Sequence, residues 1–139
     1  MIDRLTLEEI EHITFSLARK EYGHFEHMPD FNTRFPNILE SCLAQPFQTF
    51  GKKQLYPSFI NKASILFYLM IKNHPFQNGN KRVAVATLLY FLSKYGKWLD
   101  LETKTLYNLA LAVSESDPKK KDKAIKFISE VIDLFVVDY

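Results

Sequence analysis

The chain has 139 residues, of which 47% are hydrophobic and 24% are charged, and its formal net charge is +2. These values are ordinary for a globular protein with one buried core, and they exclude a disordered or fibrous chain. We therefore expect a single domain over residues 1–139, and the weak charge gives no indication of a nucleic-acid partner.

Cys42 is the single cysteine of the chain. An internal disulfide is therefore excluded, and a small buried thiol in an apolar helix is the favoured interpretation. No uninterrupted apolar run approaches the ~20 residues that span a bilayer, and residues 1–6 contain no apolar leader core. We expect a cytoplasmic protein with no membrane partner.

The N-terminal segment predicts an amphipathic helix. Thr6-Leu7-Glu8-Glu9 has the pattern of a capping box, in which the hydroxyl of Thr6 accepts from the amide of Glu9 and the Glu9 carboxylate reaches back. Apolar residues then recur at three- and four-residue steps, at Ile10, Ile13, Leu17 and Ala18. We expect a helix over about residues 6–22, ended by Gly23.

Residues 24–36 are polar and aromatic, are interrupted by two prolines and follow no period, so we expect a loop. The spacing of His24 and His27 in this loop matches no metal-binding pattern, and we expect both side chains to be solvated. A short helix is expected over residues 36–44, because proline suits the first helical turn and Pro46 would stop the helix.

Residues 47–57 alternate in polarity around a Gly-Lys-Lys turn, and two interpretations stay open. One is a short hairpin that acts as a flap for docking a target. Its tip would then consist of Phe50, Gly51, Lys52 and Lys53. The other is an irregular connector that fills the core with Phe47, Phe50 and Tyr56.

Two strongly apolar segments predict buried helices. Ser58 begins the first, which leaves little polar surface and ends at Lys72-Asn73. The second runs from about Asn80 to Tyr95 and is closed by Gly96. A polar stretch of ten residues, 73–82, spans the junction of the two helices.

The C-terminal third predicts an extended link at residues 98–101, a helix capped by Thr103 and a last helix opened by Asp117-Pro118. The lysine-rich residues 119–123 are expected to be a solvated helix start. No repeat is present, and strands do not alternate with helices. We therefore expect an all-α fold, a compact helical bundle.

The polar stretch is Asn73-His74-Pro75-Phe76-Gln77-Asn78-Gly79-Asn80-Lys81-Arg82. Gly79 and Asn80 come just before a helix, where free backbone amides and the helix dipole favour an anion. Lys81 and Arg82 fall in the first turn, where the dipole disfavours cations, so a bound phosphate would offset their placement. The alternative is that both side chains point to solvent or pair with Asp100 or Glu102.

His74 lies close to this expected anion site and is placed to act as a base, because histidine accepts a proton near neutral pH. The alternative is a structural histidine that binds the last carbonyls of the preceding helix. Phe76, between polar neighbours, is expected to anchor the loop to the core.

The stretch resembles the signature of the Fic/Doc superfamily, His-x-Phe-x-Asp/Glu-Gly-Asn-Gly/Lys-Arg, and Lys81 resembles the Doc type, the death-on-curing toxins. The similarity extends to the opening Leu-Thr-Leu-Glu-Glu, to residues 39–46, to Leu55-Tyr56-Pro57 and to the helix that leads into His74. Nearly the whole chain is covered, and the resemblance implies an all-helical fold.

The resemblance also implies a nucleotide-dependent enzyme that modifies proteins. His74 would take the proton from a target hydroxyl. Gly79 and Asn80 would form the phosphate cradle, while Lys81 and Arg82 would neutralise phosphate charge. Doc transfers the terminal phosphoryl group of ATP to a threonine of elongation factor Tu, whereas Fic enzymes with glycine at the position of Lys81 transfer AMP. Lys81 thus favours kinase chemistry with Mg²⁺, and AMP transfer is the alternative.

Two residues depart from the family pattern. Asn78 replaces the acidic residue that binds Mg²⁺, and an amide oxygen is a weaker ligand for this cation than a carboxylate. This substitution leaves open a third interpretation, a binding protein that keeps the fold without catalysis. Val85 stands where the longer Fic motif has a second arginine. Because the sequence contains no Ser/Thr-x-x-x-Glu-Gly/Asn inhibitory signature, the resemblance implies a separate antitoxin as partner.

Overall fold

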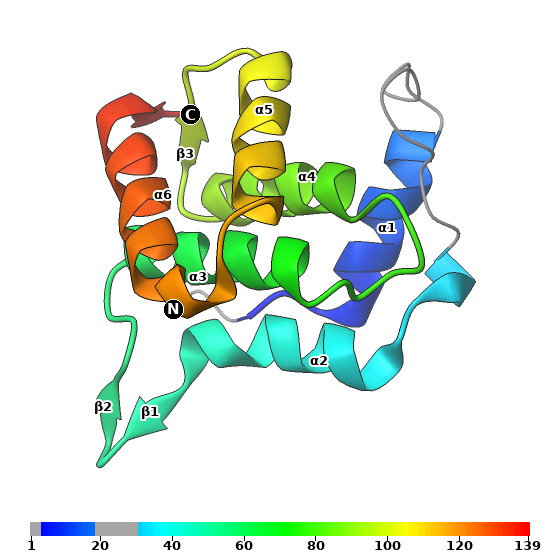
Figure 1. Ribbon diagram of the computed structural model, residues 1–139, viewed down its shortest axis with the longest axis horizontal. Helices are drawn as coiled ribbons and strands as arrows, with labels where there is room; N and C mark the ends of the chain where they lie inside the picture. Colours follow the sequence, from blue (N-terminus) through cyan, green and yellow to red (C-terminus); the bar gives the residue numbers. More distant parts are fainter. Residues whose placement is uncertain (1–3, 19–30) are drawn as a thin grey trace.

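Two helices, α3 (Phe59–Lys72) and α4 (Asn80–Ser93), run side by side through the middle of the molecule (Figure 1). The structure, a computed structural model, describes residues 4–18 and 31–139. Every residue of α3 from 62 to 71 is buried. Five apolar side chains of α4 are fully enclosed, namely Val83, Ala84, Leu88, Phe91 and Leu92. The two predicted buried helices are confirmed, although α4 ends at Ser93 rather than Tyr95.

The ends of this helix pair follow from local chemistry. The hydroxyl of Ser58 accepts a hydrogen bond from the amide of Asn61 at 3.0 Å, which confirms Ser58 as the cap of α3. Gly96 follows α4 with a φ of +70°, a left-handed conformation that glycine adopts without steric cost. Ser58 and Gly96 thus mark the outer ends of the pair, and the polar stretch joins its inner ends.

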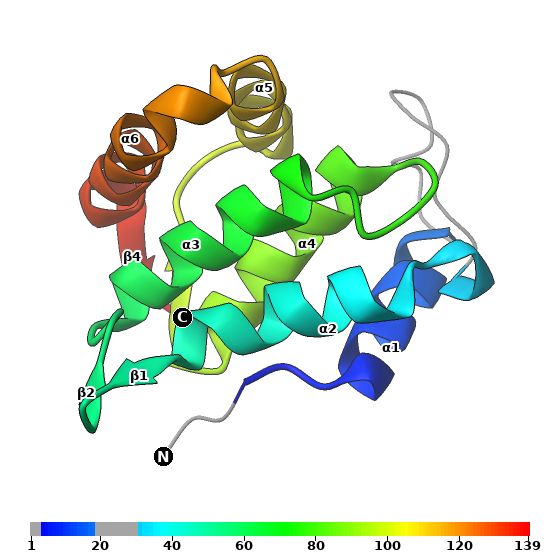
Figure 2. The ribbon, with the colours of Figure 1, turned by 60° about the horizontal axis from the view of Figure 1, so that its bottom comes forward.

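Helices α1 (Leu7–Ala18) and α2 (Pro36–Ala44) pack on one side of the α3–α4 pair (Figure 2). The Glu9 amide donates to Oγ1 of Thr6 at 3.1 Å, and the Thr6 amide donates to Oε1 of Glu9 at 3.0 Å, so the capping box is confirmed. The expected continuation of this helix to residue 22, its terminator Gly23, and the histidines at 24 and 27 lie outside the described residues.

Residues 31–47 contain two short 3₁₀ helices that the sequence did not predict. The predicted loop ends in a short 3₁₀ helix, η2 (Phe31–Thr33). Helix α2 ends at Ala44, as predicted for a stop at Pro46, and η3 (Gln45–Phe47) follows it as a 3₁₀ turn whose first positions tolerate proline. Cys42 of α2 is fully buried, as expected, and burial raises the pKa of its thiol to about 11.

The segment after η3 forms a hairpin of two antiparallel strands, β1 (Thr49–Phe50) and β2 (Lys53–Gln54). Gly51 and Lys52, the two residues of its turn, have φ values of +57° and +68°, as a type I′ turn requires. The predicted hairpin is therefore confirmed as a structure, while its docking role stays a prediction, and the connector interpretation is wrong for Phe50, whose side chain is 80% exposed.

Helices α5 (Thr103–Ser114) and α6 (Lys121–Phe135) cover the other side of the pair, with η4 (Pro118–Lys120) leading into α6 (Figure 2). The cap position of α5 is Glu102, and Thr103 is instead the first helical residue, so the prediction of Thr103 as cap is wrong. The carboxylate of Asp117 accepts from the amide of Lys119 at 2.9 Å and opens η4.

The expected extended link is partly a strand, β3 (Lys97–Leu99), which pairs antiparallel with β4 (Val136–Asp138). The sequence did not predict β4, because a three-residue strand has no readable period and its partner lies far away in the chain. With only these two small strand pairs beside its helices, the described structure confirms the all-α prediction. Across residues 4–18 and 31–139, every helix is too short or too polar to span a bilayer.

Candidate functional site

The loop that joins α3 to α4 is braced by the side chain of Asn80. Its Oδ1 accepts from the amide of Phe76 at 2.9 Å, and its Nδ2 donates to the carbonyl of Phe76 at 3.0 Å. Both functional atoms of the Asn80 amide are therefore used inside the loop, and the residue is only 7% exposed. The side chain of Asn80 fixes the loop, so at a phosphate site it would contribute its backbone amide.

Two further contacts tie the loop to the body of the protein. Phe76 is 1% exposed, and its ring lies 6.4 Å from that of Phe31, centroid to centroid. The carbonyl of Pro75 accepts from the amide of Phe35, just before α2, at 2.8 Å. The backbone between these anchors has little freedom, while His74, Gln77 and Asn78 remain exposed.

His74 adopts a backbone conformation that is uncommon for a residue with a side chain. Asn73, the C-terminal cap of α3, still has right-handed helical backbone angles, and His74 follows with a φ of +50°. This position after a helix is usually taken by glycine, because a Cβ atom there costs roughly 1 kcal/mol or more. Such local strain is frequent at functional sites, where the surrounding contacts enforce it. Here the conformation projects an exposed imidazole from a rigid loop.

The N-terminus of α4 presents backbone amides and a cation together. Gly79 is the cap residue, with a φ of +73°, and it has no side chain that could accept from the first-turn amides. The first turn contains no acidic residue, and Lys81 is half-buried there. Backbone amides, the positive end of the helix dipole and an ammonium group together favour an anion such as phosphate.

Arg82 behaves differently from Lys81. Its side chain is 6% exposed and lines a cavity of about 520 Å³ that is bounded by α1, α4, α5, β3 and the C-terminal Tyr139. The other lining residues are His12, Ile13, Ser16, Val85, Ala86, Leu89, Tyr90, Ser93, Trp98, Thr103, Lys104, Tyr107 and Tyr139. The structure therefore places Arg82 inside the fold beside this cavity, whereas His74, Asn78 and Gly79 are not among the residues that line it.

The model of the Fic/DOC family matches residues 4–92, well over half of the chain. The chain belongs to the Fic/DOC family. The match includes α1 to α4 and the whole loop, and it ends just before the last residue of α4. No match was found among curated proteins or among solved structures. Membership makes the chain one of a family of protein-modifying enzymes that transfer nucleotide-derived groups.

Asn78 stands at the position where the family signature has an acidic residue that binds magnesium. Asn78 is exposed and offers a neutral amide oxygen. Among the described residues, no group of three or more histidine, cysteine, aspartate or glutamate side chains is arranged to hold a metal ion. Protein sites for Mg²⁺ normally provide one or two carboxylates in addition to substrate phosphates. The residues of this loop do not fit a dedicated Mg²⁺ site.

The predicted flap is not part of the loop site. The hairpin directly precedes the start of α3, whereas His74 follows its end, so the two lie at opposite ends of this 14-residue helix (Figures 1 and 2). A 14-residue helix is ~21 Å long. The structure thus brings His74, Gly79 and Lys81 together at one end of α3 and keeps Phe50, Gly51, Lys52 and Lys53 at the other.

The cavity beside Arg82 was not foreseen from the sequence. Its aromatic residues come from α4, β3, α5 and the C-terminal residue, and no motif connects them. One signal was present: Arg82, Ala86, Leu89 and Ser93 recur at helical spacing on a helix that was expected to be buried. This spacing marks a second face of α4 that does not pack against α3.

Proposed function

We propose that this protein is a Doc-like toxin, a kinase that transfers the terminal phosphoryl group of ATP to a hydroxyl of a translation factor such as elongation factor Tu. The observation that carries the proposal is the rigid loop, which presents an exposed His74 and the amide-lined, Lys81-bearing start of α4 within one short segment. A base and an anion site on one braced element are what phosphoryl transfer to a hydroxyl requires.

In the proposed reaction the target hydroxyl oxygen attacks the γ-phosphorus of ATP, its proton passes to the imidazole of His74, and the bond to the leaving ADP breaks. The first-turn amides of α4 and the ammonium of Lys81 stabilise the phosphate charge that develops. Magnesium chemistry, if supplied, would come with the nucleotide, because Asn78 contributes no carboxylate. An action on translation would place the protein in the cytoplasm.

The test is incubation of the purified chain with ATP and elongation factor Tu, followed by intact-mass analysis of the factor. We expect a phosphoryl adduct with the parent chain and a rate lower by ~10²–10⁴ with His74→Ala, the usual contribution of a general base. An adenylyl adduct would instead establish AMP transfer, the alternative enzymatic function. No adduct, and no His74-dependent growth arrest in cells, would refute both.

The third candidate, a binding protein without catalysis, is favoured by Asn78 alone. Asn78→Asp restores the acidic residue of the family signature and lies on the exposed part of the loop, so the fold should tolerate it. If Asn78→Asp creates transfer activity that the parent lacks, the parent is a binder. If the parent is already active, that candidate is eliminated.

We propose further that a separate antitoxin restrains the protein. The cavity beside Arg82 supports such a partner, because its walls combine aromatic side chains with Lys104, His12 and Arg82, while none of its described lining residues is acidic. An acidic, partly apolar segment of a partner fits this chemistry. A Lys104→Glu variant should escape the antitoxin at unchanged kinase activity, as measured by growth arrest on co-expression.

A further inference from the structure

The buried ammonium group of one lysine of α3 contacts the chain at both ends of the hairpin. Lys62, on the first turns of α3, is 5% exposed. Its Nζ donates to Oε1 of Gln54 in β2 at 2.5 Å and also donates to the carbonyl of Tyr56, just after β2. The same ammonium lies 5.5 Å from the ring centroid of Phe47, just before β1. One side chain thus contacts the chain on both sides of the hairpin.

The rest of the hairpin has few attachments of its own. Each strand is only two residues long, and all residues from Gln48 to Leu55 are exposed. The two legs are held together by the short ladder and by the bond from the Leu55 amide to the Gln48 carbonyl at 3.1 Å. A two-stranded hairpin of this size is not stable alone, so its orientation depends on what holds its base.

The charge on Lys62 does not raise the free energy of unfolding of the whole protein. Both hydrogen-bond acceptors are neutral, and burial lowers the pKa of Lys62. A lysine whose pKa is lower in the folded than in the unfolded chain costs the folded state stability while it is protonated, and this cost disappears only above the unfolded value. The charge of Lys62 therefore does not stabilise the fold as a whole, and its hydrogen bonds act at the base of the hairpin.

We propose that Lys62 is a positioning residue for protein docking, whose ammonium fixes the hairpin on α3 and so presents the exposed tip to a partner. The tip displays Phe50 at 80% exposure next to Lys52 and Lys53, and residues 47–57 contain no acidic side chain. The partner surface is accordingly apolar and acidic. That this partner is the substrate protein rests on the proposed function, whereas the fixing of the hairpin does not.

The decisive experiment is limited tryptic cleavage of the full chain after Lys52 and Lys53, compared with Lys62→Met. Methionine keeps an apolar stem of similar length but removes the ammonium. We expect cleavage in the hairpin about tenfold faster, the effect of losing charged hydrogen bonds on a local opening equilibrium, with an unchanged or higher melting temperature. Cleavage at the exposed Lys119 and Lys120 serves as internal reference and should not change.

The matched control is Lys72→Met. Lys72 is the other inward-reaching lysine of α3, and its Nζ donates to the carbonyls of Ser116 at 2.6 Å and Ser114 at 3.4 Å, far from the hairpin. This variant should leave hairpin cleavage unchanged. Gln54→Ala, which removes one acceptor from the exposed side, should give a smaller acceleration than Lys62→Met and remains informative if Lys62→Met folds poorly.

The docking part is tested with elongation factor Tu, the protein substrate of the proposed function. Lys62→Met should raise KM for the protein substrate several-fold, while kcat and KM for ATP stay unchanged. Unaltered cleavage in both the Lys62 and Gln54 variants would overturn the fixing of the hairpin. Accelerated cleavage with an unchanged KM would overturn docking alone, and an inactive parent with accelerated cleavage would refute the proposed function while leaving the role of Lys62 in the hairpin intact.

Discussion

At the scale of single residues, the loop between α3 and α4 combines an uncommon backbone conformation with a complete set of internal hydrogen bonds. The φ of His74 is +50°, and the Asn80 amide satisfies both the amide and the carbonyl of Phe76. A buried, unsatisfied backbone group would cost about 1–3 kcal/mol. The hydrogen bonds of Asn80 avoid this cost and so offset the strain at His74. The hydrogen bonds of Asn80 stabilise the loop, and the positive φ of His74 lowers its stability.

The conformation of His74 predicts that two variants with equally low activity differ in stability. His74→Gly should be more stable than His74→Ala by ~1 kcal/mol, because glycine adopts a positive φ without a Cβ clash. Both variants should lose most transfer activity. Chemical denaturation at pH 7 gives the free energies of unfolding. An alanine variant as stable as the glycine variant would show that the position carries no strain.

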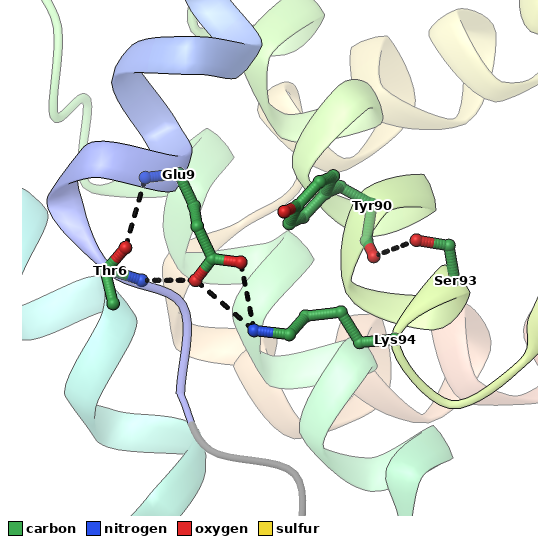
Figure 3. Close-up of polar contacts among 5 residues, drawn as sticks. All are labelled: Thr6, Glu9, Tyr90, Ser93 and Lys94. Atoms are coloured by element: carbon green, nitrogen blue, oxygen red, sulfur yellow. Dashed lines mark hydrogen bonds and ion pairs between the residues drawn. The ribbon is translucent and has the colours of Figure 1, made fainter.

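At the scale of elements, a cluster of polar side chains joins the start of α1 to the end of α4 (Figure 3). The carboxylate of Glu9 serves Thr6 in the capping box and also accepts from Nζ of Lys94, with a shortest distance of 3.0 Å. Burial by itself raises the pKa of Glu9, but hydrogen bonds from the Thr6 amide, Lys94 and Tyr90 together hold that pKa below its ordinary value. The same carboxylate raises the pKa of Tyr90.

This cluster predicts a stability loss in acid. Because the pKa of Glu9 is lower in the folded chain, its contribution is complete above about pH 4.5 and is lost as the pH falls through the folded value. Glu9→Gln should therefore destabilise the protein by ~1 kcal/mol at pH 7 and by less in strong acid. The measurement is thermal unfolding as a function of pH.

Glu8→Gln is the control for the Glu9 variant, since Glu8 lies exposed in the same first turn of α1. It removes an equal charge near the helix N-terminus and should change stability only slightly. Equal effects of the two variants, or an effect of Glu9→Gln that does not depend on pH, would contradict a specific role of the Glu9–Lys94 pair.

At the scale of the whole molecule, the core continues beyond the segment that the family match covers. Ile128 and Ile132 of α6, which packs on α3, are fully buried in the core, and Leu106 and Ala110 of α5 are buried too. The loop site therefore depends on α3 and α4, and these helices are covered on one side by elements outside residues 4–92. We expect the two parts to unfold as one cooperative unit.

Ile132→Ala tests this dependence. Removing a fully buried isoleucine side chain should cost ~2–5 kcal/mol. Leu134→Ala on the same helix should cost little, because Leu134 is 75% exposed. Calorimetry of Ile132→Ala should show a single transition at lower temperature, with transfer activity retained below it. Two separate transitions would show that α6 unfolds independently of the loop site.

The sequence alone determined the helical fold, the capping box at Thr6, the cap at Ser58 and the concentration of chemistry at residues 73–82. These features depend on neighbours a few residues apart, and periodicity, caps and glycine positions report such contacts directly. The family signature is likewise a local pattern. The capping of α5 was misjudged because Glu102 and Thr103 are adjacent and helix ends vary by a residue.

Only the tertiary structure decided which of these residues share a site. It separated the hairpin from His74 by the length of α3, turned Arg82 toward a cavity and used the Asn80 side chain as a brace. It also paired β3 with β4 and brought the Lys62 ammonium into hydrogen-bonding contact with Gln54 of the hairpin. These arrangements join residues from different elements, and the packing of the core that sets them leaves no periodic trace in the chain.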